Sequence, residues 1–394
     1  MSLEMVPFKA SDANNLISFT DLSSIVGKYF KFDQGFMDEV HGGIPTFIVQ
    51  KNDNLKSGFR QLKFSLDTYQ AFPVLREAED KAQCVLRIFG TRKSVSRGPG
   101  RRRKIPVQLV LLIATLITVS ISGYLLSGLW LDSIGEPTSL PVVLLTTAEY
   151  AASLMAILTV HELGHVIATK LHLIKSSLPY FIPAPPYLGP GLYTPGTFGA
   201  VILQSGSPVN RDQLFDLGIA GPFSGFLVAI IVTFIGVGLS QSITAQPGAQ
   251  FSYPPPLLLL MINLFPGAFP PGTAISLHPI AQAGYLGLII TCLNLFPSSQ
   301  LDGGHMSRAA FGAKGYQRAS VLSLLILLFL GSIPPYTFLP FALLLFFFSL
   351  GGSHPGPLDD VSKITKGRKV LLLLGFVVLL LSLPMDYLRI LPSL

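Results

Sequence analysis

The residue pattern best suited to chemistry in this sequence is HELGH, which runs from His161 to His165. Side chains four residues apart project from the same face of an α-helix, so the two imidazoles can occupy two corners of a tetrahedral zinc site. Glu162 lies between them, where its carboxylate can take a proton from a water molecule at the metal without binding the metal itself. The pattern therefore predicts two zinc ligands and a general base on one helix.

The residues on either side of HELGH indicate that this helix lies in a membrane. AASLMAILTV leads into the pattern from Ala151, and VIAT continues it as far as Lys170. A helix that is apolar nearly all round is buried in lipid or in a large core, whereas a soluble metalloprotease would show a polar face here. His161 precedes Lys170 by a distance of roughly 13 Å along the helix axis. Ionisable side chains at such a depth are costly and indicate a function.

The composition agrees with an integral membrane protein. Hydrophobic residues make up 49% of the 394 residues and charged residues only 12%, about half the charged share of a typical soluble domain. The net charge is +7, but the basic residues cluster at the ends of apolar runs. They therefore indicate orientation in a membrane and not a surface for nucleic acid. The two cysteines, Cys84 and Cys292, lie in different regions and are interpreted as free packing residues.

Residues 1–96 differ from the rest of the chain because charged residues are spread throughout them. SSIVGKYFKF predicts a short amphipathic helix and LKSGFRQLKFSLDTY a second helix, while IPTFIVQ, FPVLRE and CVLRIFG are candidate strands. We therefore expect a small soluble α+β domain here. A basic linker at 97–104 follows it, directly before the first apolar run, and marks that side of the membrane as cytoplasmic.

Residues 105–394 are expected to form a polytopic α-helical membrane domain of about seven transmembrane helices, with a core at 141–310. The expected spans run over about 105–131, 141–170, 214–240, 279–297, 319–333, 336–350 and 370–383. Each is near the roughly 20 residues that a bilayer requires, although the last three are short. The segment 257–269 is too short and too rich in proline to span, so we interpret it as interfacial or re-entrant.

The distribution of basic residues agrees with seven spans and a cytoplasmic N-terminus. The loops expected at 132–140, 241–278 and 334–335, on the outer side, contain no Lys or Arg, and Arg389 in the outer tail is the exception. The loops expected on the inner side contain Lys170, Lys175, Arg211, Arg308, Lys314, Arg318, Lys363, Lys366, Arg368 and Lys369. This asymmetry follows the positive-inside rule, and we expect a multi-pass protein of the cell membrane.

A catalytic zinc site needs a third protein ligand and one open position for water. Asp302, in LDGGH at the inner end of the fourth expected span, is the preferred candidate. A carboxylate that follows a long apolar run needs a counter-charge, and a metal supplies one. His305 is the alternative ligand; it lies further toward the cytoplasm and near Arg308.

The stretch between the second and third expected spans, LPYFIPAPPYLGPGLYTPGTFGAVILQ, is rich in proline and glycine. So many prolines exclude a stable helix, while Thr197–Gln204 has β character. Non-helical backbone is tolerated at membrane depth where protein or a water-filled cavity covers it. An edge strand here could pair with an unwound substrate segment; the alternative interpretation is an ordinary cytoplasmic loop.

Four motifs in this order, HELGH, GTFGA, AGPFSG and NLFPSSQLDGGH, resemble the site-2 protease family of intramembrane zinc metalloproteases over about residues 140–310. The resemblance implies that His161, His165 and Asp302 bind one Zn²⁺ ion. It also implies that Glu162 is the catalytic base and that Asn294 positions the substrate or stabilises the oxyanion. The substrates of this family are single-span membrane proteins, cut within the bilayer in regulated intramembrane proteolysis. Many members carry a PDZ domain that filters substrates, and this sequence departs from them because none is found in it.

Two other classes of function are considered for a membrane chain with a metal site. A metal transporter places ionisable residues on several helices along a path, whereas here they gather at one depth and Glu162 has no role. A catalytically silent protein that binds membrane segments has no need to keep Glu162. We therefore expect a zinc metalloendopeptidase, with a membrane-protein substrate and the lipid bilayer as partners and no nucleic acid.

Overall fold

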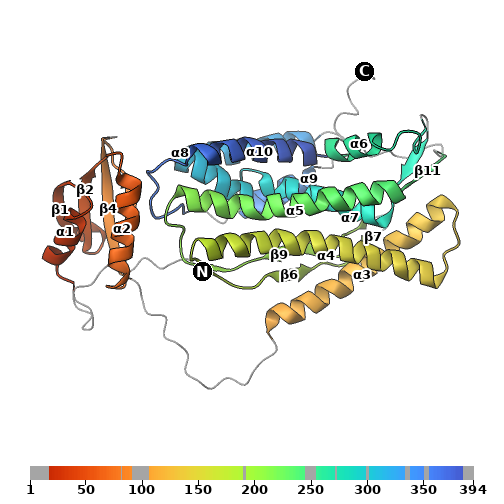
Figure 1. The fold of residues 1–394 in the computed structure, drawn as a ribbon, viewed down its shortest axis with the longest axis horizontal. Coiled ribbons are helices and arrows are strands. Elements are labelled where there is room, and N and C mark those ends of the chain that lie inside the picture. The colour runs from red at the N-terminus through yellow and green to blue at the C-terminus, as the bar shows by residue number, and fades with distance from the viewer. Residues whose placement is uncertain are drawn as a thin grey trace.

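The computed structural model describes residues 17–80, 82–90, 106–189, 192–244, 254–270, 273–298, 301–332, 338–349 and 355–384. The expected linker at 97–104 lies outside the described residues. In the described part of the chain, a sheet with two helices comes first and a bundle of long apolar helices follows (Figure 1).

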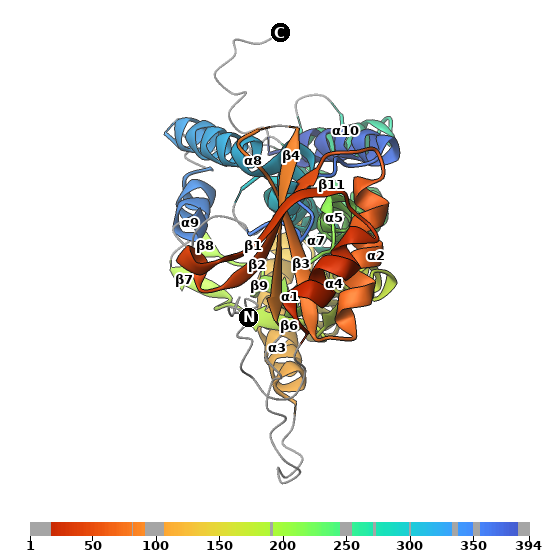
Figure 2. The same ribbon diagram turned by 90° about the vertical axis from the view of Figure 1, so that its left-hand side faces the viewer.

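The N-terminal part forms a four-stranded antiparallel sheet with strand order β1-β2-β4-β3. Its elements are α1 (Phe19–Gly27), β1 (Phe32–Asp38), β2 (Ile44–Gln50), α2 (Leu55–Asp67), β3 (Ala71–Glu77) and β4 (Gln83–Gly90). Both helices lie on the same side of the sheet (Figure 2). The predicted helix SSIVGKYFKF is only partly right, because α1 ends at Gly27 and Phe32 begins an edge strand that was not predicted.

The core of this part lies between the helices and the sheet. Val26, Phe59 and Leu62 from the helices are fully buried against Phe47 and Leu86 from the strands. Burial of such side chains contributes about 1.5–3 kcal/mol each. Leu55, Phe59, Leu62 and Leu66 line one face of α2, as their spacing predicted.

Within the described residues, four helices are long and apolar enough to cross a membrane. They are α3 (Val107–Ile134), α4 (Leu140–Leu171), α5 (Arg211–Leu239) and α8 (Asp302–Gly331). Shorter apolar helices are α7 (Pro279–Leu295), α9 (Leu339–Ser349) and α10 (Lys366–Ser382), while α6 (Pro256–Asn263) has only eight residues. The structure thus bears out a polytopic membrane protein with a small N-terminal sheet.

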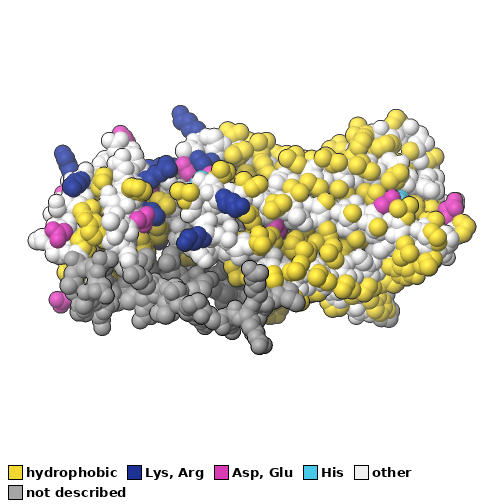
Figure 3. Space-filling model, turned by 60° about the horizontal axis from the view of Figure 1, so that its bottom comes forward, with side chains coloured by type: hydrophobic (Ala, Val, Ile, Leu, Met, Phe, Trp, Pro, Cys, Tyr) yellow, Lys and Arg dark blue, Asp and Glu magenta, His cyan; other side chains and the backbone are white. Residues whose placement is uncertain are grey.

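The surface separates into two zones along the long axis. Lys and Arg side chains gather over the N-terminal sheet and the adjoining ends of the helices, and hydrophobic side chains cover most of the remaining length (Figure 3). Exposed residues of α3 such as Ile113, Ile117 and Ile121 belong to this apolar surface. An apolar belt beside a basic end is the pattern of a protein embedded in a bilayer.

Short β-strands lie between α4 and α5, and one of them, at Thr197–Val201, falls where the sequence predicted β character. They are β5 (Lys175–Ser176), β6 (Tyr180–Pro183), β7 (Tyr187–Gly189), β8 (Leu192–Tyr193), β9 (Thr197–Val201) and β10 (Gln204–Ser205). β6 pairs with β9, β5 with β10, and β7 with β8. Gly196, with φ of 82°, packs against the backbone of α3, where a Cβ atom would lie 2.5 Å from the carbonyl oxygen of Thr118.

A two-stranded antiparallel sheet lies at the end of the helices that is far from the N-terminal sheet. β11 (Gln241–Ile243) pairs with β12 (Ala274–Ser276), and α6 lies between them in the chain. Eight residues rise about 12 Å, which is less than half of the hydrocarbon thickness. α6 therefore does not cross the bilayer, as its sequence led us to expect.

The structure corrects the place of Asp302. The sequence suggested the end of the fourth span, but α7 ends at Leu295 and Asp302 begins the next helix, α8. Phe296 is extended and Pro297 follows it, so the chain leaves the helix there. α8 has a kink at Gly312, where φ is 72° and ψ is −173°, so the fifth expected span is only the second half of a longer element.

Candidate metal centre

His161 and His165 lie on one face of α4, with their Nε2 atoms 3.3 Å apart. Both histidines lie below the surface, and His161 is only 4% exposed. The continuous helix from Leu140 to Leu171 sets this geometry, because residues four apart are neighbours on a helix surface. The prediction that the two rings face the same point is confirmed.

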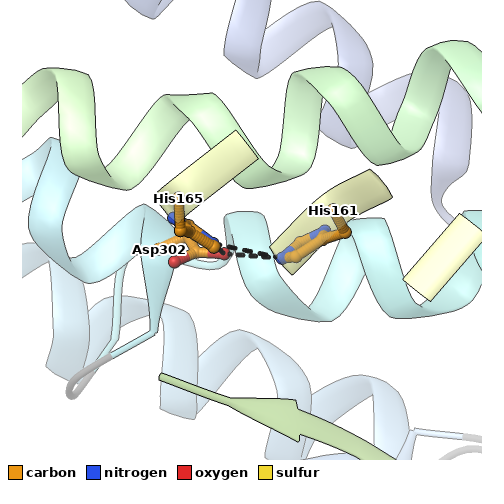
Figure 4. A group of neighbouring side chains, drawn as sticks. All are labelled: His161, His165 and Asp302. Carbon is orange, nitrogen blue, oxygen red and sulfur yellow. Dashed lines mark hydrogen bonds and ion pairs between the residues drawn. The ribbon is translucent and has the colours of Figure 1, made fainter. Parts of the chain in front are cut away.

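Asp302, on the first turn of α8, completes the group. Its Oδ2 atom lies 3.3 Å from Nε2 of His161 and 3.3 Å from Nε2 of His165 (Figure 4). Tetrahedral zinc bonds of 2.0–2.1 Å would place neighbouring ligand atoms about 3.3–3.4 Å apart. All three separations match this value, so the donor set fits one zinc ion.

A backbone contact fixes the tautomer that metal binding needs. Nδ1 of His165 lies 2.8 Å from the carbonyl oxygen of Leu217 on α5. Because a carbonyl oxygen can only accept, Nδ1 carries the proton and donates it, which leaves the lone pair of Nε2 free to bind a metal. Leu217 is a functional contact that the sequence did not reveal, since any residue has a carbonyl oxygen.

Small residues of α5 make room for the two imidazole rings. A Cβ atom on Gly221 would lie 2.0 Å from Nε2 of His165, and one on Gly225 would lie 3.0 Å from Cβ of His161. On α4 itself, a Cβ atom on Gly164 would lie 2.5 Å from the carbonyl oxygen of Ala220. The AGPFSG motif therefore lets α5 approach close enough to hold both ligands in place.

Two further side chains that the sequence singled out lie at the group. Glu162 is only 7% exposed, and in the described part of the chain no protein donor bonds its carboxylate. Nδ2 of Asn294, near the end of α7, lies 3.3 Å from Nε2 of His161. Asn294 therefore lies beside the atoms that would bind the metal.

His305, the alternative third ligand, does not join the group. Among the residues that the structure describes, the group whose ligand atoms lie within 4.8 Å of one another is His161, His165 and Asp302. Nδ1 of His305 instead donates to the carbonyl oxygen of Leu301 at 3.0 Å, one turn back along the chain.

Comparison with known proteins found one family model and several curated relatives that match this chain. Residues 149–332, which contain the whole group, match the model of Peptidase family M50. The chain is 31% identical over 242 residues to "Probable zinc metalloprotease EGY1, chloroplastic" of Arabidopsis thaliana, covering 59% of this chain and 42% of that protein. It is 30% identical over 230 residues to "Probable zinc metalloprotease EGY2, chloroplastic" of the same plant, covering 58% of this chain and 39% of the relative.

The chain spans about two fifths of the length of these curated relatives. No solved structure matches the chain.

Proposed function

We propose that this chain, a member of Peptidase family M50, the site-2 protease family, is an intramembrane zinc metalloendopeptidase. It would hydrolyse peptide bonds in the transmembrane segments of membrane proteins, in regulated intramembrane proteolysis. The relatives named zinc metalloproteases support a zinc enzyme. The observation that carries the proposal is the equal 3.3 Å spacing of three ligand atoms from two different helices.

The proposed roles of the residues follow from their places in the group. When bound by His161, His165 and Asp302, zinc supplies a Lewis acid that lowers the pKa of water and polarises a carbonyl group. Glu162 takes a proton from the attacking water and passes it to the leaving amine nitrogen. The amide of Asn294 donates a hydrogen bond to the oxygen on which negative charge develops.

The proposed substrate is an unwound segment of a single-span membrane protein, because a peptide bond inside a helix is shielded. β9 pairs with β6 on one side and supplies strand backbone close to α4. Phe198 of β9 is 68% exposed. An extended substrate segment could add to this strand through main-chain hydrogen bonds.

The proposed topology has seven spans, with α7, α9 and α10 as the three shorter ones. The beginning of α5 pairs with α10 through Arg368 and Asp216, and Asp216 also bonds His172 at the end of α4. These contacts bring the end of α4 and the beginnings of α5 and α10 to the same end of the helix bundle. Successive spans alternate in direction, so this arrangement agrees with the proposed topology. We propose that this end and the soluble domain at 1–96 face the cytoplasm of a multi-pass cell-membrane protein, following the positive-inside rule.

The test is Glu162→Gln in purified full-length protein, with bound zinc measured beside cleavage of a single-span membrane substrate. Loss of the base should reduce cleavage by about 10²–10⁴-fold, while one zinc per chain stays bound. His161→Ala should lose both zinc and cleavage, because it removes a ligand. Equal cleavage by wild type and Glu162→Gln would contradict the proposal.

The same experiment separates the two other classes of function. A metal transporter or a silent binding protein would show no cleavage in the wild type and no effect of Glu162→Gln on metal content or segment binding. Metal content that is unchanged in Glu162→Gln is expected of all three classes, so the absence of cleavage by the wild type is the result that would reject the proposed peptidase.

A further inference from the structure

A short segment before α10 joins the N-terminal sheet to the membrane helices. In this segment, residues 357–361, here called the strap, the backbone N–H of Leu358 donates to Pro208 at 2.9 Å, and that of Asp359 to Val209 at 2.8 Å. On its other side, Leu75 of β3 donates to Leu358 at 2.9 Å and accepts from Asp360 at 3.2 Å. The strap therefore lies between the edge of the N-terminal sheet and the residues that precede α5.

Side chains fix the strap against the N-terminal core. Leu358 and Val361 are 7% and 8% exposed and belong to the same core cluster as the sheet. The carboxylate of Asp359 is buried and accepts from the backbone N–H groups of Val361 and Ser362, each at 3.0 Å. Arg76 donates to the carbonyl oxygen of Leu358 at 2.8 Å. Separation of the strap from the N-terminal sheet would expose apolar surface and break these hydrogen bonds.

The next strap residue, Asp360, points the other way and binds two arginines of the membrane helices. Its two carboxylate oxygens accept from Nη1 and Nη2 of Arg308 at 2.8 and 2.6 Å. Oδ1 also accepts from Nε of Arg211 at 3.1 Å, and Nη2 of Arg211 donates to the backbone oxygen of Asp360. A two-point arginine–carboxylate pair is among the strongest and most directional polar contacts. Arg308 is only 3% exposed, so solvent screens this pair little.

Two glycines leave room for these guanidinium groups. A Cβ atom on Gly356, where φ is 76°, would lie 2.4 Å from Nη2 of Arg308. One on Gly312, where φ is 72°, would lie 2.8 Å from Nη2 of Arg211. Left-handed backbone of this kind is costly for other residues. Both glycines thus leave room for the paired arginines, and Gly312 also lies where α8 bends.

Arg308 and Asp302 share a short helical unit. They are six residues apart on α8, a rise of about 9 Å, and the kink at Gly312 separates this unit, residues 302–311, from the rest of the helix. Gly303 packs against the backbone of Leu295, where a Cβ atom would lie 2.0 Å from the carbonyl oxygen. The position of Asp302 therefore depends on the contacts that hold this helical unit. Arg308 supplies an ion pair, with Asp360, toward the end of the unit that is far from Asp302.

We propose that Asp360 is a positioning residue for the zinc site. By holding Arg308 and Arg211 together, it fixes the 302–311 unit to α5 and keeps the carboxylate of Asp302 within bonding distance of the metal that the two histidines share. Metal sites require their ligands within about 0.5 Å of the productive geometry. This inference rests on the proposed zinc site, and it adds that the docked N-terminal sheet contributes to the affinity of that site.

The test compares zinc affinity, measured by competition with a chromophoric chelator, in wild type, Asp360→Asn and Lys56→Gln. Lys56 binds Asp212 of α5 and the backbone of Lys363, so it lies in the same interface without contacting α8. Zinc should bind about tenfold more weakly to Asp360→Asn, as for changes to groups that support metal ligands. The zinc affinity of Lys56→Gln should stay within about twofold of wild type, because the Lys56–Asp212 ion pair that it removes is partly exposed.

Equal zinc affinity in Asp360→Asn and wild type would overturn the inference, as would an equal loss in both variants. If Asp360→Asn does not fold, Arg308→Lys decides, because it keeps the charge and loses the two-point contact. Weaker zinc binding by Arg308→Lys supports the inference and unchanged binding overturns it. If wild type itself binds no zinc, the proposed function fails, and that outcome is distinct from the others.

Discussion

His161 and His165 lie in the second half of an uninterrupted helix of 32 residues, whereas Asp302 lies on the first turn of a short helical unit. The histidines are held by close packing of α4 on the glycines of α5. The aspartate is held through Arg308 and Asp360, by ion pairs that reach the N-terminal sheet. One side of the metal centre thus depends on shape, and the other depends on charges brought together from distant parts of the chain.

The two sides of the metal centre therefore tolerate different substitutions and different salt concentrations. Packed glycines accept no added volume, but salt has little effect on them. Ion pairs keep their geometry only while every partner stays in place, and removing one partner leaves the others buried and unpaired. Changes in distant parts of the chain can therefore alter the position of Asp302 more readily than the positions of the two histidines.

The largest effect is expected from adding volume on the histidine side. Gly221→Ala would place a methyl group over Nε2 of His165, so the ring must move and one metal bond is lost. Zinc affinity should fall by about 100-fold, the upper end of the range for groups that support metal ligands. Titration with a zinc-selective chelator checks this value. Gly128→Ala on α3, where a Cβ atom meets nothing within 4 Å, is the control, and an equal loss there would contradict the packing argument.

A smaller effect is expected from loosening the aspartate side at a distance. Leu358→Ala leaves a cavity between the strap and the N-terminal sheet, which should destabilise this core by about 2–5 kcal/mol. Pulse proteolysis of the N-terminal part measures the loss, and zinc affinity should fall by only a few-fold because Asp360 keeps its arginines. Leu173→Ala, at a side chain that is 92% exposed, is the control. Unchanged protease resistance in Leu358→Ala would show that the strap does not complete the core.

The smallest effect is expected at the carboxylate of Asp38, which lies in the N-terminal sheet and contacts neither side of the metal centre. The hydrogen bond from Nδ1 of His41, at 2.8 Å, lowers the pKa of Asp38 below its usual range, and the nearby charges of His41 and Arg87 act in the same direction. A carboxylate with a lowered folded-state pKa stabilises the fold above its unfolded pKa of about 3.9 and loses this contribution as the pH falls through the folded value.

Asp38→Asn should therefore lower the melting temperature slightly at neutral pH, and the difference from wild type should shrink as the pH falls below the unfolded pKa of about 3.9. Thermal melts over this pH range measure it. A difference that grows as the pH falls would mean that Asp38 is stabilised in its protonated form, in contradiction to the structure.

The sequence predicted the histidine side of the centre more completely than the aspartate side. The spacing in HELGH is local, so helix geometry alone places both rings. Asp302 was found because a charge after a long apolar run is costly, but its helix was assigned wrongly. The Gly-Gly pair after Asp302 has low helix propensity, so the sequence did not predict a helix there. The structure shows why glycine is needed at this place, because a Cβ atom on Gly303 would collide with the backbone of Leu295.

The strap and its arginines could not be derived from the sequence. Arg211, Arg308 and Asp360 are each separated by about 50 residues or more, and nothing local links them. The edge strand β1 was also missed, since FDQGFMD lacks a clear alternation and contains a glycine. The core of the N-terminal part was predictable in its helix and three strands because their apolar spacing is regular.

The position of the strap in the chain also bears on synthesis. The N-terminal sheet is made before the membrane helices, and domains generally fold as units, those made earlier first. Here Leu358 and Val361 of its core are made after α3, α4, α5, α7, α8 and α9. A nascent chain that already carries His161, His165 and Asp302 still lacks Asp360, so the metal centre reaches its final geometry only after the strap has also been made.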